Sequence, residues 1–335
     1  MASLRRLPLL LLPLLAVSAG CGAEDGGSAS SGDGRVRVVT TVSPLTSIIA
    51  NVVGDRATVT GIVPEGADSH TFEPPPSAAR VLADADVVFL NGLQLEDPTR
   101  DLATRSRRPG AETVELGGLT LAPAEEIYDF SFPRAGGKPN PHLWTNPPMV
   151  RRYAEIVRDT MTRIDPVGAA TYQEHTAAYT AKVDALDVAL RAATATLPAE
   201  RRKLLTYHDA YAYFAREYGW AVIGAIQVSD LEDPTPREVA GLIDQVRAEG
   251  VPAIFGSEVF PSPVLERIGT EAGVRYVDEL RDDDLPGRPG DPRHSLLGLL
   301  QLDFVTMVRS LGGDPAALEA LDVSDVSPAE ATYQQ

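Results

Sequence analysis

The chain has 335 residues, with 30 Lys and Arg against 47 Asp and Glu, a formal net charge of −17 and a single Cys. This charge argues against a nucleic-acid partner, because phosphate backbones are held by clusters of Lys and Arg. One Cys excludes an internal disulfide, a Cys-rich zinc site and an iron–sulfur cluster. The length predicts two domains or one large one.

Residues 1–20 have the pattern of a bacterial secretory signal. Two arginines precede an apolar run over residues 7–17, which is far shorter than the ~20 residues of a membrane-spanning helix. Small residues at 18–20 lead directly to Cys21, as in a lipoprotein box. We therefore expect a signal peptide, lipidation at Cys21 and an extracytoplasmic, membrane-anchored protein; a secreted protein with a free thiol is the alternative. The Gly- and Ser-rich residues 21–35 predict a flexible tether.

Strands and helices alternate over residues 36–164. Residues 36–42, 58–63 and 87–90 are rich in β-branched or large apolar side chains and predict buried strands. Residues 77–85 predict a helix. This alternation is typical of a mostly parallel sheet covered by helices, so residues 36–164 are predicted to form an N-terminal α/β lobe.

Residues 165–197 predict one long helix. Asp165-Pro166 is a typical helix start, with proline at the first helical position. Apolar and aromatic side chains then recur at spacings of three and four from Tyr172 to Leu190, and Leu197-Pro198 ends the pattern. A helix of ~30 residues is ~45 Å long, which is enough to span both halves of the protein.

The same alternation resumes in residues 198–313, which are predicted to form a C-terminal lobe. Thr235-Pro236-Arg237-Glu238 is a capping box that begins a helix, and Gly250 ends that helix. Strands are predicted over 203–207, 221–226, 251–256 and 274–277, and helices over 236–249, 263–272 and 295–311. Residues 314–335 remain as a C-terminal tail. The predicted fold class is α/β, with two lobes that each have a central, mostly parallel sheet flanked by helices and are joined by one long helix.

Four side chains of metal-binding type stand at the ends of strands or in loops. His70, His208 and Asp278 each follow a predicted strand, and His142 lies in a Pro-rich loop. In open α/β sheets ligands bind beyond the carboxyl ends of the strands. Three imidazoles and one carboxylate are a suitable set of ligands for a divalent cation such as zinc. From these residues alone, a metal site and separate structural roles are equally good hypotheses.

Several stretches between residues 36 and 313 form a recognisable series. They are Val39-Thr40-Thr41-Val42-Ser43-Pro44-Leu45, the loop over 66–74, Asn91-Gly92-Leu93-Gln94-Leu95-Glu96, Pro141-His142-Leu143-Trp144, Tyr207-His208-Asp209-Ala210-Tyr211, Glu232-Asp233-Pro234-Thr235-Pro236 and Val277-Asp278-Glu279-Leu280. In these stretches the chain resembles the zinc/manganese-type substrate-binding lipoproteins of bacterial metal ABC transporters. The resemblance implies a monomeric carrier that holds a metal ion between two lobes, works with a membrane permease and has no enzymatic activity.

The resemblance also implies which residues hold the ion. The four implied metal ligands are His70, His142, His208 and Asp278. The fourth position stays open to water or to a neighbouring carboxylate, because Glu279 is adjacent and residues 282–284 are three aspartates nearby. Asp209 and Glu258 are expected to orient the imidazoles through hydrogen bonds, although ordinary solvation is an equally good role for both. Three nitrogens and one carboxylate favour zinc, and manganese comes second because it prefers more oxygen ligands.

Other functions remain open at this point. A zinc-dependent hydrolase would use the same residue types, but it needs an open coordination position and a general base, and the chain has no His-Glu-x-x-His motif. A surface adhesion lipoprotein would hold a metal for structural reasons. A carrier of a chelated metal or another small molecule would have a ligand-sized pocket in place of the histidine cluster.

Overall fold

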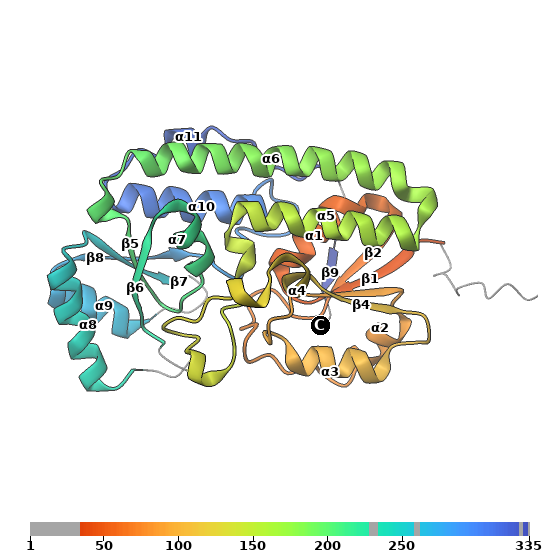
Figure 1. Ribbon diagram of the computed structural model, residues 1–335, viewed down its shortest axis with the longest axis horizontal. Coiled ribbons are helices and arrows are strands. Elements are labelled where there is room, and N and C mark those ends of the chain that lie inside the picture. The colour runs from red at the N-terminus through yellow and green to blue at the C-terminus, as the bar shows by residue number, and fades with distance from the viewer. Residues whose placement is uncertain (1–33, 228–233, 258–261, 328–330, 334–335) are drawn as a thin grey trace, which may run out of the picture.

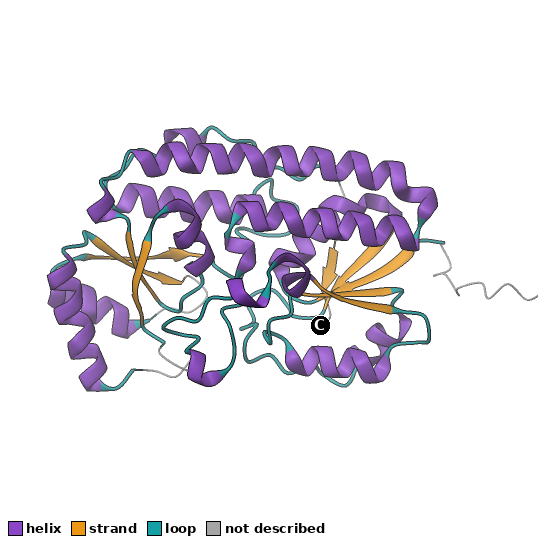
Figure 2. Cartoon of the chain, in the orientation of Figure 1, coloured by secondary structure: helices purple, strands orange, loops and turns teal. Residues whose placement is uncertain are grey.

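The computed structural model describes residues 34–227, 234–257, 262–327 and 331–333, in which two groups of strands lie at opposite ends of the molecule (Figure 1). Helices cover both groups (Figure 2). The signal peptide over 1–20, Cys21, almost all of the tether and Glu258 lie outside the described residues. No helix in the described part of the chain combines the length and the apolar character needed to cross a membrane.

The first group of elements forms a five-stranded parallel sheet in the order β4-β3-β1-β2-β9. Its elements are β1 (Val36–Thr40), α1 (Ser43–Val53), β2 (Ala57–Gly61), α2 (Ala78–Asp84), β3 (Val87–Leu90), α3 (Asp97–Ser106), β4 (Glu112–Glu115), α4 (Leu116–Thr120), α5 (Pro147–Ile164) and β9 (Ala331–Tyr333). Strand β3 is buried along its whole length, as a central strand of a parallel sheet should be. The β9 strand pairs with β2, so the end of the predicted tail returns to the first sheet.

The second group contains two parallel strand pairs, β5-β6 and β7-β8, with β5 in contact with β7. Its elements are β5 (Lys203–Thr206), α7 (Ala212–Tyr218), β6 (Ala221–Ala225), α8 (Pro236–Glu249), β7 (Ala253–Ser257), α9 (Pro263–Ala272), β8 (Arg275–Leu280), α10 (Leu296–Ser310) and α11 (Ala316–Glu319). The predicted capping box is present at the start of α8, where the Thr235 hydroxyl accepts from the Glu238 amide and the Glu238 carboxylate accepts from the Thr235 amide.

The long helix α6 (Ala169–Ala195) runs across the top of both groups (Figure 1). It contacts α1 and α5 over the first group and α10 and α11 over the second. The helix begins after a short 3₁₀ turn (Pro166–Gly168), a few residues later than predicted. Apolar side chains from both ends of α6, including Tyr172, Val183 and Leu190, belong to one continuous core.

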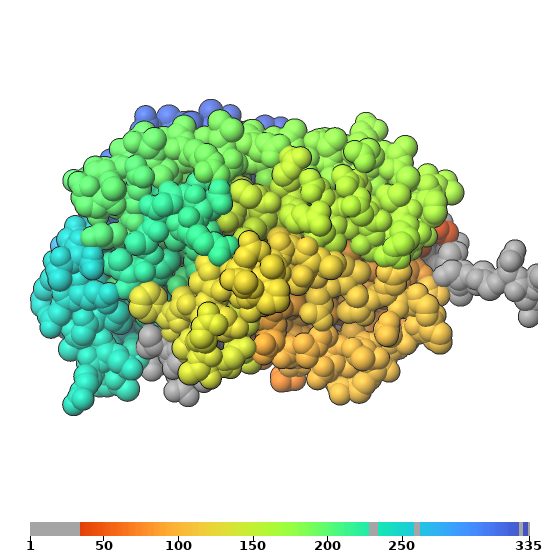
Figure 3. Space-filling model, viewed as in Figure 1, coloured from red at the N-terminus to blue at the C-terminus, as the bar shows by residue number. Residues whose placement is uncertain are grey.

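The segment 121–146, between α4 and α5, crosses from the first group of strands to the second. It is yellow in Figure 3 and lies over the middle of the molecule, between the orange and teal parts. Its Ser131 hydroxyl donates to the Gln227 carbonyl at 2.7 Å and accepts from the Asp209 amide at 3.0 Å. The Thr145 hydroxyl donates to the Ala210 carbonyl at 2.9 Å. These bonds fasten the His142 loop to the second group of elements.

Candidate metal centre

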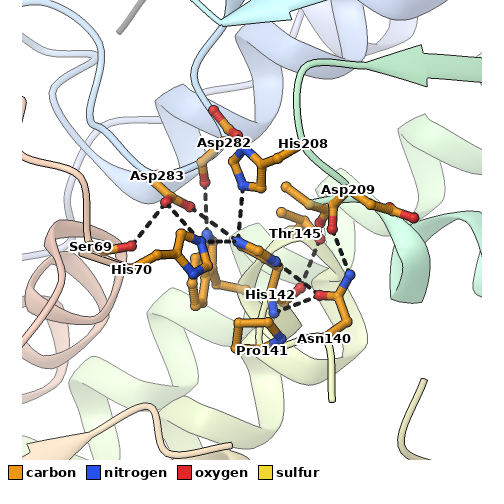
Figure 4. A network of polar contacts seen from close by, with 12 residues as sticks. Ser69, His70, Asn140, Pro141, His142, Thr145, His208, Asp209, Asp282 and Asp283 are labelled. Carbon is orange, nitrogen blue, oxygen red and sulfur yellow. Dashed lines mark hydrogen bonds and ion pairs between the residues drawn. The ribbon is translucent and has the colours of Figure 1, made fainter. Parts of the chain in front are cut away.

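Three histidines and one aspartate converge where the two groups of strands meet (Figure 4). His142 Nε2 lies 3.1 Å from the Nε2 atoms of both His70 and His208. Asp283 Oδ2 is 3.7 Å from His70 Nε2, and Asp283 Oδ1 is 3.6 Å from His142 Nε2. One ligand atom from each of the four residues lies within 4.8 Å of all the others. A tetrahedral ion with bonds of about 2.0–2.1 Å sets its ligand atoms about 3.3 Å apart, so this group has the dimensions of a metal site.

The four side chains come from four separate connections. His70 lies between β2 and α2, and His142 lies at the end of segment 121–146. His208 follows β5, and Asp283 follows β8. The carboxyl ends of strands therefore deliver three of the four residues, as the rule for open α/β sheets predicts. The structure brings the three predicted histidines together.

The predicted fourth ligand, Asp278, is not part of this group. Its side chain is exposed on β8, and the strand continues to Leu280 before the chain turns inward. Asp283 comes five residues later, and its side chain is only 7% exposed. We therefore correct the assignment and place Asp283 as the candidate carboxylate ligand.

Asn140 fixes the orientation of the His142 ring. The Asn140 Oδ1 atom accepts hydrogen bonds from His142 Nδ1 at 2.9 Å and from the His142 amide at 3.0 Å. The Asn140 side-chain amide in turn donates to Asp129 Oδ2 and to the Asp209 carbonyl. Because Nδ1 carries the proton in this arrangement, the Nε2 lone pair is directed to the metal position. Asp209, predicted to orient an imidazole through a hydrogen bond, contributes its main-chain carbonyl, which accepts from Asn140 and not from a histidine.

Asp282 holds the His208 ring in the equivalent way. Its Oδ2 atom lies 3.0 Å from His208 Nδ1, and its Oδ1 accepts from the Ser257 hydroxyl at 3.3 Å. The Asp282 carbonyl accepts from the Trp144 indole at 2.8 Å. The sequence analysis assigned no role to Asn140, and it considered Asp282 only as one of the carboxylates near the fourth ligand position. Each stands next to or close to a ligand in the sequence, and that proximity is the only signal that could have suggested them.

The protonation of the four side chains follows from burial and from the two adjacent aspartates. Burial lowers the pKa of His70 and of His142 well below the usual value, and the positive charge of His208 adds to this at both rings. Burial also disfavours charge on His208, but the carboxylate of Asp282 outweighs it and raises the pKa of His208 to about 9. Burial, and then the charge of Asp282, raises the pKa of Asp283 to about 7. At neutral pH and without an ion, two rings are ready to bind metal and the third carries a proton.

Replacing Asn140 with alanine should weaken metal binding about ten- to hundredfold, the range typical of residues that orient a metal-binding histidine. Without Oδ1 the His142 ring loses the acceptor that fixes its tautomer. Competition against a chromophoric chelator measures the change. The matched control is Gln245→Ala, which removes an amide that donates to the Ile223 carbonyl far from the site. Equal affinities in the two variants would show that Asn140 does not orient the ligand.

Comparisons with known proteins agree with this geometry. A family described as "Zinc-uptake complex component A periplasmic" matches residues 38–309. The manganese-binding lipoprotein MntA of Halalkalibacterium halodurans is 29% identical over 303 residues, which cover 90% of this chain and 97% of that protein. The iron-binding protein YfeA of Yersinia pestis is 29% identical over 278 residues, covering 83% of this chain and 87% of that protein. The structure of the periplasmic zinc-binding protein TroA from Treponema pallidum superposes with a TM-score of 0.75 at 25% identity, covering 83% and 99% of the two chains.

The family match spans most of the chain, and the relatives are matched over nearly their whole length. Their names describe metal-binding proteins and not enzymes. The relatives differ in the metal named, so the comparisons give the class of cargo and not its identity. A further relative, the manganese ABC transporter substrate-binding lipoprotein PsaA of Streptococcus pneumoniae, is 26% identical over 290 residues, covering 86% of this chain and 92% of that protein. The chain belongs to the family of periplasmic zinc-uptake components, and it is a metal-binding substrate-binding protein of an ABC transporter.

Proposed function

We propose that this protein captures zinc, with manganese as its second choice, and delivers the ion to a membrane permease. The observation that supports zinc is the convergence of three imidazole Nε2 atoms on one position, with a single carboxylate beside them. Zinc accepts tetrahedral sites of nitrogen and oxygen ligands, whereas manganese prefers a larger number of oxygens.

The same ligand set argues against a zinc-dependent hydrolase. A catalytic zinc keeps one coordination position open for water or substrate. Here His70, His142, His208 and Asp283 supply four ligand atoms within 4.8 Å of one another, which fills a tetrahedral shell. A carrier needs a filled site of this kind, because it has to hold its cargo and not to react with it.

We further propose that the ion joins two lobes, over residues 36–164 and 198–313, that separate when it is released. The Asp282-Asp283 pair is held from both sides. The Ser69 hydroxyl donates to Asp283 Oδ2 at 2.9 Å from the first lobe, while Asp282 is bound to His208 and Ser257 in the second. The helix predicted over 165–197, which contacts both lobes as α6, would limit how far they move. Lipidation of Cys21 would keep the monomeric carrier beside its permease.

Competition dialysis tests the choice of metal. Metal-free protein is dialysed against equal free concentrations of zinc and manganese, and the bound metal is counted by mass spectrometry. We expect one zinc per chain. One manganese per chain would contradict the zinc assignment but would still support a function as a metal carrier. Retention of neither metal would contradict the proposed function as a whole.

Metal binding should release about one proton at pH 8, because a binding imidazole must give up its proton. At this pH His208, with a pKa of about 9, is protonated, and Asp283, with a pKa of about 7, is ionised. Affinity should therefore fall as the pH drops below 9, and near pH 6 the number of released protons should rise to about two. Calorimetry in buffers of different ionisation enthalpy counts the protons. A heat of binding that does not depend on the buffer would contradict this expectation.

A further inference from the structure

A cavity of about 190 Å³ lies directly beside the metal centre. His70 forms part of its lining, together with residues 93–95, Phe132 and the loop that includes Lys138. The Phe132 ring centroid lies 5.7 Å from the ring of His70 and 5.5 Å from that of His142. The same side chains therefore border the metal position and the cavity, which we call the side chamber.

The charge of the side chamber is opposite to that of the chain as a whole. The chain has 47 acidic residues against 30 basic ones. Among the described residues that line the side chamber there is no carboxylate, and Lys138 is the only one besides His70 that can carry a positive charge. A compartment built only to draw in a bare divalent cation would be lined with carboxylates. A lysine instead favours an anion.

The backbone of the side chamber adopts an uncommon conformation. Leu93 and Gln94 are consecutive non-glycine residues with positive φ, 55° and 64°. Glu96 holds this turn, because its buried carboxylate accepts hydrogen bonds from the Asn91 and Gly92 amides and from the Thr41 hydroxyl. Strained backbone that the surrounding structure maintains is concentrated at ligand-binding sites.

Resting on the proposed function, we propose that the side chamber holds a small organic carboxylate that is captured together with the metal ion and lies outside its four protein ligands. Three neutral imidazoles and one aspartate leave a net positive charge on a divalent ion, and a carboxylate held on the other side of the His70 ring would balance that charge. Lys138 would pair with the outer end of the carboxylate, and the ring of Phe132 would cover its carbon skeleton.

Retention of labelled citrate tests this inference. Metal-free protein is mixed with a preformed one-to-one complex of zinc and radiolabelled citrate and passed through a desalting column, and zinc and citrate are counted per chain. We expect both to be retained by the wild-type protein. Citrate retention should fall at least tenfold in Lys138→Glu. The matched control is Arg134→Glu, which makes the same change of charge in the same loop at an exposed residue that does not line the side chamber.

The outcomes separate this inference from the proposed function. Zinc retained without citrate would overturn the side chamber as a carboxylate site and leave the metal carrier intact. Citrate retained equally by the wild-type protein and by Lys138→Glu would also overturn it, and so would citrate retention that does not require zinc. Failure of the wild-type protein to retain zinc supplied without citrate would instead contradict the proposed function.

Discussion

Replacing His142 with alanine is expected to lower metal affinity by at least about a hundredfold, because changes at residues that merely orient a ligand already cost ten- to hundredfold. The His142 side chain is fully buried, and its Nε2 atom is the only one of the three that lies 3.1 Å from both of the others. Its ring packs against Phe132 and Trp144, with centroids 5.5 and 5.0 Å away. A water molecule that replaced the imidazole would face these apolar rings and would bind the ion poorly.

The control for His142→Ala is His294→Ala, which removes a histidine outside the group. His294 Nε2 lies 2.9 Å from Glu65 Oε1, away from the four ligand atoms. Chelator competition should give this variant the affinity of the wild-type protein. If His142→Ala bound zinc as tightly as His294→Ala, the central place of His142 in the metal centre would be refuted.

Local patterns in the sequence were sufficient to predict the α/β class and to single out His70 and His208 as residues that follow predicted strands. A run of β-branched residues predicts a strand, and the residue after that strand lies at the edge of the sheet where ligands bind. His208 follows β5 in this way. His142 follows no strand, and only the resemblance to a known family favoured a shared metal site over separate structural roles for the three histidines.

Helices α1 and α5 were not predicted from the sequence, although each has proline in its first turn, where proline is well tolerated. Pro44 stands at the start of α1, and Pro147 and Pro148 begin α5. The pairing of β9 with β2 joins residues that are more than 270 positions apart, and no local pattern reports such a contact.

The fourth ligand was misplaced because the end of β8 was misjudged. The prediction ended this strand at residue 277, which put Asp278 at the edge of the sheet. The structure continues β8 to Leu280, with Asp278 and Glu279 both exposed. The register between β7 and β8 shifts near this end, so the alternation of buried and exposed residues does not locate the last residue of the strand. Placing the end of this strand three residues too early was enough to assign Asp278 as the ligand in place of Asp283.

A matched pair of variants tests this correction. Asp283→Ala should lower zinc affinity at least tenfold, the lower end of the range for residues that support a metal site. Asp278→Ala, which removes an exposed carboxylate from the same stretch of chain, should leave it unchanged. The loss in Asp283→Ala should be larger for manganese, because manganese depends more on oxygen ligands. Parallel titrations of both variants with the two metals measure these differences.

Thermal melting of the metal-free variants separates loss of a ligand from loss of the fold. Burial raises the pKa of Asp283 to about 7, which means that its carboxylate is unfavourable in the empty site at neutral and higher pH. Metal-free Asp283→Ala should therefore melt no lower than the wild-type protein at pH 8, even though it binds zinc more weakly. A lower melting temperature for Asp283→Ala would mean that a disturbed fold causes its weaker binding. Weak binding in Asp278→Ala together with normal binding in Asp283→Ala would restore the assignment made from the sequence.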